Sequence, residues 1–536
     1  MSLGRPIDLS EALPALRRGR MVKPSLSGYW VEREPPAGWK VMDRRDLPGG
    51  RVEIVADPSG IRQRYHVLPW EHTVDGDDAR LLAAAVKKVR SVPPKALGGE
   101  KTELRSHVRS LVRSMDPPPG IEDHLLDAVT RNTLGLGVLD IILRDNRVED
   151  IYVDAPSQDT RVYLTLNGAG GGNLFGRCET NIIVSEKEMV GLVSRLKYRS
   201  GRPFSSSSPV LETDITETGV RATALCPPLS PDGLALALRR RSDVPWTLLR
   251  LAERGSLDAV AAGLLSFLVD GRASILVCGA RGSGKSSLLS ALLFEFPLDQ
   301  RILVIEDTRE VPVNALQSLG FKVQSMLVDP SSSNDRASSA EEALRVSLRL
   351  GESAIVVGEV RGREAMTLYE SMRTGKAGSS VLGTIHGNGA MEVHDRVVNE
   401  LGIPEASFAS TDVIVTMGLV RPGGGLGQVR RITEVAEVVR TPEGLRFLPM
   451  LTYDGGYHLS ERKMPLLARI ASGWGMSYEE GLENLRRRIG LRETLLEMGH
   501  EDEMYLSPSC SLQANEYLWQ GGTDAGQTFM DHLRGR

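Results

Sequence analysis

The chain has 536 residues, more than one ordinary hydrophobic core holds, so we expect three or four domains. Its 41% apolar and 25% charged residues are typical of a globular protein that folds in water. The formal net charge of -4 gives no overall attraction to nucleic acid or to an anionic membrane, so we expect no direct nucleic-acid binding.

The four cysteines are far apart in the sequence and form no C-x-x-C pair: Cys178, Cys226, Cys278 and Cys510. This spacing favours reduced cytosolic thiols over a zinc knuckle or a disulfide framework. Residues 1–20 lack the apolar core of a signal peptide, and no apolar run approaches the roughly 18 residues that span a bilayer. If the protein works at a membrane, we expect a partner to bring it there.

Residues 1–115 mix short polar and apolar stretches, and we predict no particular fold for this N-terminal region. From 116 to 243 short helix-like and strand-like runs alternate, such as LLDAVTRNTLG and VYLTLNG. This alternation predicts a small α+β domain.

A more regular pattern extends from 244 to 452. Near-continuous apolar strands alternate with helical stretches, which indicates a mostly parallel sheet covered by helices on both faces. The five strands are SILVCG (274–279), RILVIED (301–307), SAIVVGE (353–359), SVLGTIH (380–386) and DVIVTMG (412–418). In such a sheet, ligands bind beyond the carboxyl ends of the strands.

The remaining residues, 453–536, are predicted to be helical. Ser477 and Glu480 have the spacing of a capping box, and Leu482, Leu485 and Ile489 follow at helical intervals.

Residues 279–286, GARGSGKS, match the phosphate-binding pattern G-x-x-x-x-G-K-[ST] between a predicted strand and a predicted helix. The glycines let backbone N–H groups approach phosphates, and the helix N-terminus adds favourable potential. Lys285 is expected to reach the β- and γ-phosphates, and Ser286 to ligate magnesium. A glycine-rich turn with an incidental lysine is the alternative, which the strand–loop–helix context disfavours. The expected nucleotide contacts are Gly279, Ala280, Arg281, Gly282, Ser283, Gly284, Lys285, Ser286 and Ser287.

Polar residues follow three of the other strands. Glu359 comes directly after SAIVVG, where a carboxylate can polarise an attacking water and lie near magnesium. The segment IEDTREV supplies Asp307 and Glu310 beside Glu306, although carboxylates there could also cap a helix or line a solvated turn. His386 ends a further strand. A lone histidine is more often structural, but beside a phosphate loop its imidazole can contact a γ-phosphate and distinguish ATP from ADP.

In this order and spacing, GARGSGKS, IEDTREV, VVGEVRG and GTIHGNGA resemble the Walker A, Asp box, Walker B and His box of the type II/IV secretion ATPase superfamily. DNRVEDIYVDAP (145–156) resembles a segment of that family's N-terminal domain, and the similarity covers about residues 121–500. The tetracysteine zinc insert of the bacterial secretion and pilus-extension members is absent. This absence favours the archaeal branch, with its pilus, archaellum and secretion motors, or the conjugation-type branch.

The resemblance implies a RecA-like motor domain (244–452) that hydrolyses ATP with Mg2+, a preceding PAS-like α+β domain (116–243) and a helical C-terminal region (453–536). Glu359 would be the catalytic base, supported by Asp307 and Glu310, with His386 as the γ-phosphate sensor. Magnesium would be held by Ser286 and, through water, by Glu359. The residues that would complete the site or lie at a subunit interface are Arg221 and Arg239, in GVRATA and LALRR, with Arg361 and Arg363 as weaker candidates.

The resemblance further implies a homohexamer in the cytoplasm, held at the inner face of the membrane by a polytopic platform protein of a pilus or secretion system. A nucleic-acid translocase of the conjugation type is the main alternative, which the acidic net charge and the 5% aromatic content disfavour. A scaffold that binds but does not hydrolyse ATP is a third possibility, which Lys285, Glu359 and His386 disfavour.

Overall fold

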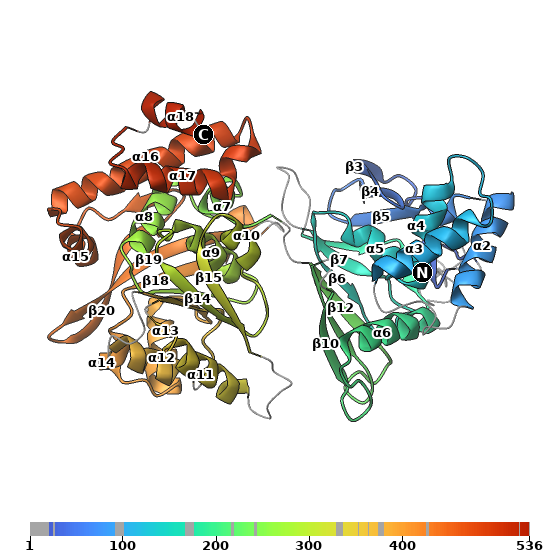
Figure 1. Ribbon diagram of the computed structural model, residues 1–536, viewed down its shortest axis with the longest axis horizontal. Helices are drawn as coiled ribbons and strands as arrows, with labels where there is room; N and C mark the ends of the chain where they lie inside the picture. The colour runs from blue at the N-terminus through green and yellow to red at the C-terminus, as the bar shows by residue number, and fades with distance from the viewer. Residues whose placement is uncertain are drawn as a thin grey trace, which may run out of the picture. The chain divides into compact units, whose positions relative to one another are not determined.

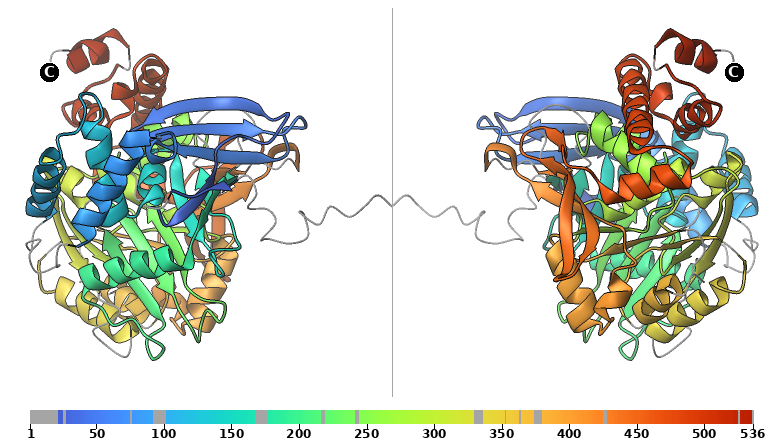
Figure 2. Two further views of the ribbon diagram at one scale, coloured as in Figure 1. Left: turned by 90° about the vertical axis from the view of Figure 1, so that its right-hand side faces the viewer. Right: turned by 90° about the vertical axis from the view of Figure 1, so that its left-hand side faces the viewer.

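The structure is a computed structural model. It divides into two compact units, Met1–Asp243 and Val244–Arg536 (Figures 1 and 2). The residues that the structure describes are 21–24, 27–74, 76–91, 101–166, 176–215, 219–240, 244–328, 336–351, 353–362, 364–373, 380–424, 428–524 and 526–534.

The first unit contains two β-sheets. A three-stranded sheet has the order β1 (Met21–Val22), β2 (Tyr29–Glu32), β9 (Ile182–Val184). A nine-stranded sheet has the order β10 (Val210–Ile215), β11 (Val220–Leu225), β12 (Ala235–Arg240), β6 (Val148–Val153), β7 (Tyr163–Leu166), β8 (Arg177–Thr180), β5 (Gln63–Pro69), β4 (Gly50–Ala56), β3 (Lys40–Leu47).

Strands from both sides of residue 115 share these sheets. β5 pairs in parallel with β8, and β2 pairs with β9. One hydrophobic core correspondingly joins Val52 and Tyr65 to Ile151 and Leu238. The N-terminal region, for which the sequence predicted no fold, therefore supplies strands to the same sheets as the α+β segment that follows it.

Helices cover the first unit. A separate apolar cluster, including Leu82, Val108 and Leu125, joins α2, α3 and α4. Met189, Leu192 and Leu196 of α6 pack into the main core of the unit. The helices are α2 (Gly76–Arg90), α3 (Lys101–Arg113), α4 (Glu122–Thr133), α5 (Val138–Leu143) and α6 (Glu186–Ser200).

The second unit is built on one nine-stranded sheet. Its order is β15 (Lys322–Leu327), β14 (Arg301–Glu306), β16 (Ala354–Val357), β17 (Val381–Ile385), β13 (Ile275–Gly279), β18 (Val413–Val420), β19 (Val429–Thr441), β20 (Gly444–Tyr453), β21 (Tyr457–Leu459). The strands from β15 to β18 pair in parallel, and those from β18 to β21 pair antiparallel. The five strands predicted from the sequence are all present and parallel, which confirms the α/β fold class.

Helices cover both faces of this sheet. Successive side chains of a strand point to opposite faces, and those of β13 accordingly enter two different hydrophobic cores. In β13, Ile275 and Val277 belong to one apolar cluster, whereas Leu276 and Cys278 belong to another. The helices that precede the C-terminal region are α7 (Leu248–Glu253), α8 (Ala259–Asp270), α9 (Lys285–Leu292), α10 (Val313–Ser318), α11 (Arg336–Ser347), α12 (Glu364–Arg373), α13 (Ala390–Asp395) and α14 (Glu405–Phe408).

The C-terminal region belongs to the second unit and is mainly helical, as predicted, although its first residues complete β20 and form β21. Its helices are α15 (Pro465–Gly473), α16 (Tyr478–Gly499), α17 (Pro508–Trp519) and α18 (Gln527–Arg534). The predicted capping box is confirmed, since the Ser477 side chain accepts a hydrogen bond from the Glu480 amide and Glu480 bonds back to the Ser477 amide. α16 crosses α8 closely: a Cβ on Gly263 would lie 2.8 Å from the Ile489 backbone nitrogen.

Candidate nucleotide site

The loop GARGSGK connects β13 to α9, and its glycines are required by its geometry. A Cβ on Gly279 would lie 2.4 Å from the Met417 carbonyl oxygen and 2.5 Å from the Ser283 hydroxyl, so no larger residue fits. Gly282 and Gly284 have φ of +79° and +97°, in the left-handed region that favours glycine. The loop leads directly into the N-terminus of α9. A glycine-rich turn followed by a helix N-terminus presents backbone N–H groups to an anion and is an arrangement that binds phosphate.

Lys285 is buried at the start of α9 and lies over the loop. Its Nζ donates hydrogen bonds to the carbonyl oxygens of Gly279 (2.9 Å) and Ala280 (3.0 Å). Burial lowers the pKa of Lys285 below its usual value, and the Glu359 carboxylate offsets part of that effect. The Ser283 hydroxyl is buried and has no hydrogen-bond partner among the described residues. An ammonium group, a turn of amides and an orphaned hydroxyl fit a phosphate chain.

Ser286 and Ser287 lie in the first turn of α9 and are partly buried, whereas Arg281 is exposed. A hydroxyl at this position is the type of ligand that magnesium takes beside a bound phosphate. Among the described residues, no group of three or more His, Cys, Asp or Glu side chains is arranged to hold a metal ion.

The strand order brings the polar strand ends together. β14, β16, β17 and β13 are consecutive in the sheet, and they are followed by Asp307, Glu359, His386 and the phosphate loop, respectively. His386 Nε2 lies 3.1 Å from Glu359 Oε1, the Arg361 guanidinium donates a hydrogen bond to Glu359 Oε2, and the same guanidinium lies 3.6 Å from Asp307 Oδ2. Side chains after β14, β16 and β17 therefore form one network.

The Glu359 carboxylate is held in its ionised form. Its side chain is 18% exposed, and this burial by itself raises the pKa. The hydrogen bond and charge of Arg361, together with His386 and Lys285, outweigh the burial and bring the pKa below its usual value. Glu359 can therefore accept a proton at neutral pH.

Hydrogen bonds between two side chains and the backbone hold the turn that carries Glu359. The Thr384 hydroxyl of β17 donates to the Gly358 carbonyl oxygen (2.6 Å). On the other side of the turn, the amides of Arg361 and Gly362 donate to Glu364 Oε1 at 2.6 and 2.7 Å, at the start of α12. The segment between β16 and α12 is thus tied to its neighbours at both ends.

The carboxylates of IEDTREV occupy three different environments. Glu306 is buried, and its Oε1 accepts hydrogen bonds from the amides of Glu310 and Val311, both at 2.9 Å. Asp307 is exposed and faces Arg361. Glu310 is exposed, and its charge makes a small contribution that opposes the lowering of the pKa of Lys285 by burial and adds to the raised pKa of Arg361, which is due chiefly to Glu359. Glu306 therefore shapes the loop, while Asp307 and Glu310 face the site.

Sequence patterns gave Glu306 and Arg361 too little weight. Arg361 contacts the carboxylates of Glu359 and Asp307, but a guanidinium two residues after a glutamate has no chemical signature of its own. For Glu306 the sequence does carry a signal. A glutamate at the end of an apolar strand is expected to be buried, and a buried carboxylate needs hydrogen-bond donors.

The two arginines of the N-terminal domain lie in the first unit. Arg221 of β11 and Arg239 of β12 are directly opposite in the strand register. Arg221 NH2 lies 3.7 Å from Glu212 Oε2, and Arg239 Nε donates to Asp150 Oδ1 at 2.8 Å. The structure thus places these guanidinium groups side by side on one sheet. Arg363 lies outside the described residues.

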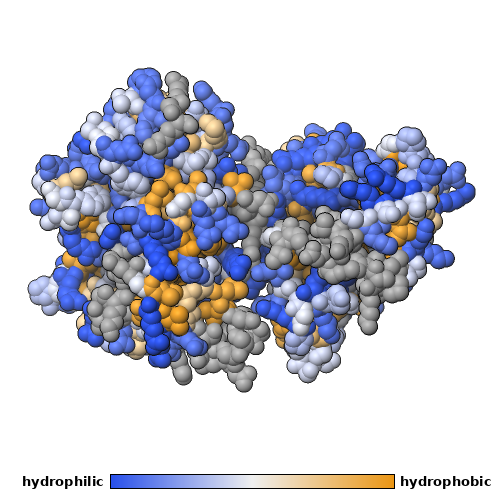
Figure 3. Space-filling view, viewed as in Figure 1, coloured by the Kyte–Doolittle hydropathy of each residue, from blue (hydrophilic) through white to orange (hydrophobic). Residues whose placement is uncertain are grey.

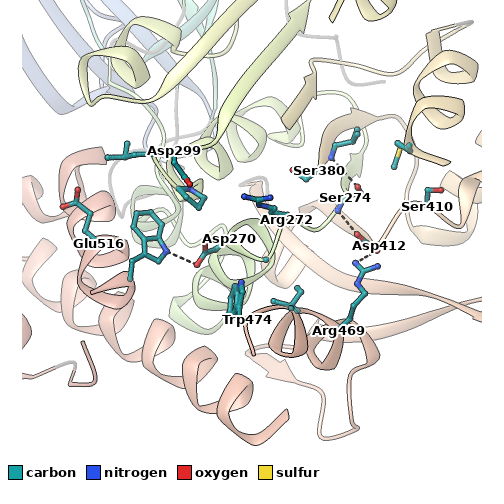
Figure 4. A pocket seen from close by; sticks show the side chains of 18 residues that line it. Asp270, Arg272, Ser274, Asp299, Ser380, Ser410, Asp412, Arg469, Trp474 and Glu516 are labelled. Carbon is teal, nitrogen blue, oxygen red and sulfur yellow. Dashed lines mark hydrogen bonds and ion pairs between the residues drawn. The ribbon is translucent and has the colours of Figure 1, made fainter. Parts of the chain in front are cut away.

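A cavity of about 1070 Å³ lies in the second unit, at the end of the parallel strands opposite to the phosphate loop (Figure 4). Ser274, Ser380 and Asp412, which line it, precede β13, β17 and β18, so the cavity is at the amino ends of these strands. Asp412 pairs there with Arg469 of α15 (2.6 Å). The phosphate loop lies at the carboxyl end of β13, where parallel sheets bind their ligands, so this cavity is separate from it.

A parallel sheet with a glycine-rich loop between β13 and α9 defines the second unit as a RecA-like P-loop domain. The chain belongs to the type II/IV secretion system protein family, whose model matches residues 187–445. A Mycobacterium tuberculosis protein whose name refers to conjugal transfer is 30% identical over 318 residues, 58% of this chain and 86% of that protein.

The chain is also similar to a secretion protein over a shorter segment and to two solved structures. The type IV secretion system protein PtlH of Bordetella pertussis is 34% identical over 134 residues, 25% of this chain and 36% of that protein. The ATPase DotB of Legionella pneumophila is 17% identical with a TM-score of 0.39, over 69% of this chain and 94% of DotB. The VirB11 ATPase of Brucella suis is 21% identical with a TM-score of 0.27, over 56% of this chain and 95% of VirB11.

Among the described residues, no helix has the length and apolar character needed to span a bilayer.

Proposed function

We propose that this protein is a magnesium-dependent ATPase that works as a homohexameric motor, powering type II/IV secretion or the assembly of a pilus-like filament. The observation that supports this most strongly is the network of Glu359, His386, Arg361 and Asp307 on the strands next to the phosphate loop. A phosphate loop by itself occurs in many protein classes. An ionised carboxylate and an imidazole beside it favour hydrolysis over simple binding.

In this proposal each step of the chemistry belongs to a different side chain. The loop amides and Lys285 bind the phosphates, and Glu359 orients the attacking water and accepts its proton. His386, on the strand between those of Glu359 and the loop, senses the γ-phosphate. Magnesium, when bound by Ser286 and through water by Glu359, would neutralise phosphate charge. Asp307 and Glu310 support the metal and the water.

Arg221 and Arg239 are proposed to complete the site of the same or a neighbouring subunit. A guanidinium stabilises charge on the transferring phosphoryl group. ATP turnover would then move the motor domain against the N-terminal domain, and a polytopic membrane platform protein would receive that movement. The proposed location is the cytoplasmic side of the membrane, where the platform partner holds the ring.

The surface of the second unit supports assembly with other subunits. Large apolar side chains are exposed there, among them Leu327, Met366 and Met391. Figure 3 shows apolar side chains gathered on one face of this unit. Exposed apolar patches are frequent at protein–protein interfaces.

The test is the variant Glu359→Gln, which keeps the shape of the side chain and removes the base. We expect ATP binding to be retained and kcat to fall by about 100-fold or more, because a general base contributes on that scale. Phosphate release and fluorescent-nucleotide binding are the measurements. The control is Glu341→Gln, which removes the partner of Arg345 in a surface ion pair and should leave kcat unchanged. Near-normal turnover by Glu359→Gln would remove Glu359 as the base.

A conjugation-type DNA-transport ATPase is the second candidate, favoured by the names of relatives such as the conjugal transfer protein TrbB of Rhizobium radiobacter, 28% identical over 239 residues. The two functions differ in what stimulates hydrolysis. Stimulation by single-stranded DNA but not by lipid vesicles would favour DNA transport, and the reverse would favour the membrane-platform motor.

A further inference from the structure

We infer that Arg430 is a positioning residue of the phosphate-binding loop, an inference that rests on the proposed nucleotide site. Arg430 belongs to β19 and lies 148 residues after Gly282, outside all four sequence motifs. Its Nε donates a hydrogen bond of 3.0 Å to the Gly282 carbonyl oxygen. The contact therefore joins the tip of the loop to an antiparallel strand of the same sheet.

The aliphatic part of Arg430 also packs against the loop. A Cβ placed on Gly284 would lie 3.6 Å from Arg430 Cδ and 3.4 Å from Met417 Cε, both ordinary van der Waals distances. Met417 and Arg430 thus lie directly beside the glycine that precedes Lys285. Arg430 thus bonds to Gly282, and its side chain occupies the space beside Gly284.

The strands behind the loop form a rigid support. β13 pairs with β18 through Gly279 and Met417, and β18 pairs with β19 through Leu419 and Arg430. The start of the loop is therefore held by β18, and its turn is held by the next strand along. This second attachment adds to the hydrogen bonds that Lys285 makes to the Gly279 and Ala280 carbonyl oxygens and that the Ser283 amide makes to Ala280.

This attachment bears on ligand binding because two glycines leave the turn with several accessible conformations. A phosphate site binds best when its N–H groups are already oriented and need no ordering on binding. Fixing the Gly282 carbonyl oxygen fixes the peptide plane that it shares with the next amide group. Arg430 thereby fixes the Gly282–Ser283 peptide, whose amide donates to the Ala280 carbonyl oxygen (3.2 Å), and so holds the shape of the turn without itself touching the nucleotide.

The expected signature is a loss of affinity shared by ATP and ADP. The loop amides bind phosphates that both nucleotides carry, whereas a side chain that contacts the γ-phosphate affects ATP alone. If Arg430 fixes the loop equally before and during the reaction, its loss raises KM and leaves kcat nearly unchanged. A residue that only stabilises the sheet would lower thermal stability without changing either affinity.

The experiment compares Arg430→Met with Arg440→Met in the full-length protein. Arg440 is exposed on the same strand and donates to the Ala406 carbonyl oxygen (3.1 Å), so it is a matched control away from the loop. For Arg430→Met we expect the Kd of both ATP and ADP to rise about tenfold, the scale of a lost charge-assisted hydrogen bond. KM should rise equally, and the Tm of the nucleotide-free protein should match that of Arg440→Met.

Three results would overturn the inference: unchanged nucleotide affinities, a loss confined to ATP, or a fall in Tm without a change in Kd. Arg430→Lys adds a further check, because an ammonium group keeps the charge but not the guanidinium geometry. We expect only partial recovery of affinity, and full recovery would assign the effect to charge and overturn the positioning role. Failure of the wild-type protein to bind ATP or ADP would instead contradict the proposed function.

Discussion

His386 is the residue whose role the sequence left most open, since a histidine between small residues is compatible with packing, metal binding or catalysis. In the structure its Nε2 lies 3.1 Å from Glu359 Oε1, and its side chain is 38% exposed. The strand that precedes it lies between the strand of Glu359 and the strand of the phosphate loop. Its neighbours therefore favour a role in the site over a role in packing.

A second histidine, His72, makes the first unit sensitive to acid. His72 is fully buried, its ring stacks on Tyr29 with centroids 5.1 Å apart, and neither ring nitrogen has a hydrogen-bond partner among the described residues. Burial lowers the pKa of His72 from 6.5 to about 4, against the opposing charge of Glu71. Between these values the unfolded chain binds the extra proton, so stability falls as the pH falls.

We predict that His72→Phe reduces this loss of stability. Between pH 6.5 and 4.5 the wild-type unit should lose about 2 kcal/mol of unfolding free energy, and the variant distinctly less, because phenylalanine keeps the stacking but not the titration. Urea unfolding at several pH values measures this. The window ends at pH 4.5, the ordinary pKa of a glutamate; below it Glu71, for which the effect of burial is outweighed by the charge of Arg131 so that the pKa falls to about 2, would add its own loss of stability. The exposed His107→Asn is the control, and identical pH slopes for wild type and His72→Phe would contradict the prediction.

At the scale of elements, the helix that begins with Lys285 is tied at its far end to the C-terminal helices. α9 continues into the short helix η4 (Leu293–Glu295), and Glu295 is 1% exposed. Its Oε2 accepts hydrogen bonds from Arg492 of α16 (2.6 Å) and from Asn515 of α17 (2.9 Å). The C-terminal region is thus attached to the core through a buried ion pair as well as through apolar packing.

We predict that Arg492→Met destabilises the second unit by about 3 kcal/mol, because it leaves a buried carboxylate without its charged partner. Adding Glu295→Gln should restore most of that loss, since the amide oxygen can still accept from Asn515. Arg487→Met, an arginine of the same helix in a surface pair with Glu483, is the control and should cost less than about 1 kcal/mol. Chemical unfolding checks all three variants. A loss from Arg492→Met no larger than that of the control would show that the pair is unimportant.

At the scale of the whole molecule, the phosphate loop belongs to one compact unit and the two candidate arginines to the other. Adjacent guanidinium groups at Arg221 and Arg239 repel each other, and the carboxylates of Glu212 and Asp150 offset this repulsion within the unit. These contacts account for the positions of both arginines without a nucleotide. A catalytic role for them therefore requires a functional test.

We predict that Arg239→Ala and Glu359→Gln, each inactive alone, partly recover ATPase activity when mixed in one ring. Recovery is expected because some sites then combine an intact arginine from one subunit with an intact glutamate from the next. Phosphate release from rings verified to contain both variants is the measurement. No recovery would indicate a site completed within one subunit, or by another arginine.

The sequence predicted five strands of the second unit because their residues are apolar on both faces. It missed β15, where Lys322 and Gln324 are exposed on an edge strand, and β3, whose segment DRRD carries charges along another edge. Edge strands are more exposed to solvent and tolerate charged side chains, so their sequences resemble those of loops. The capping box was predicted because Ser477 and Glu480 are only three residues apart and so form a local sequence pattern.

By itself, the sequence determined the phosphate loop, the strand–loop–helix context and the capping box, because each depends on residues close together in the chain. Tertiary structure alone decided which strand ends meet. Asp307, Glu359 and His386 come together because β14, β16, β17 and β13 are neighbours in the sheet, an order that differs from their order in the chain. The same pairing brings Arg430 to the Gly282 carbonyl oxygen from a distant strand. Such contacts arise from non-local strand pairing, which no short motif encodes.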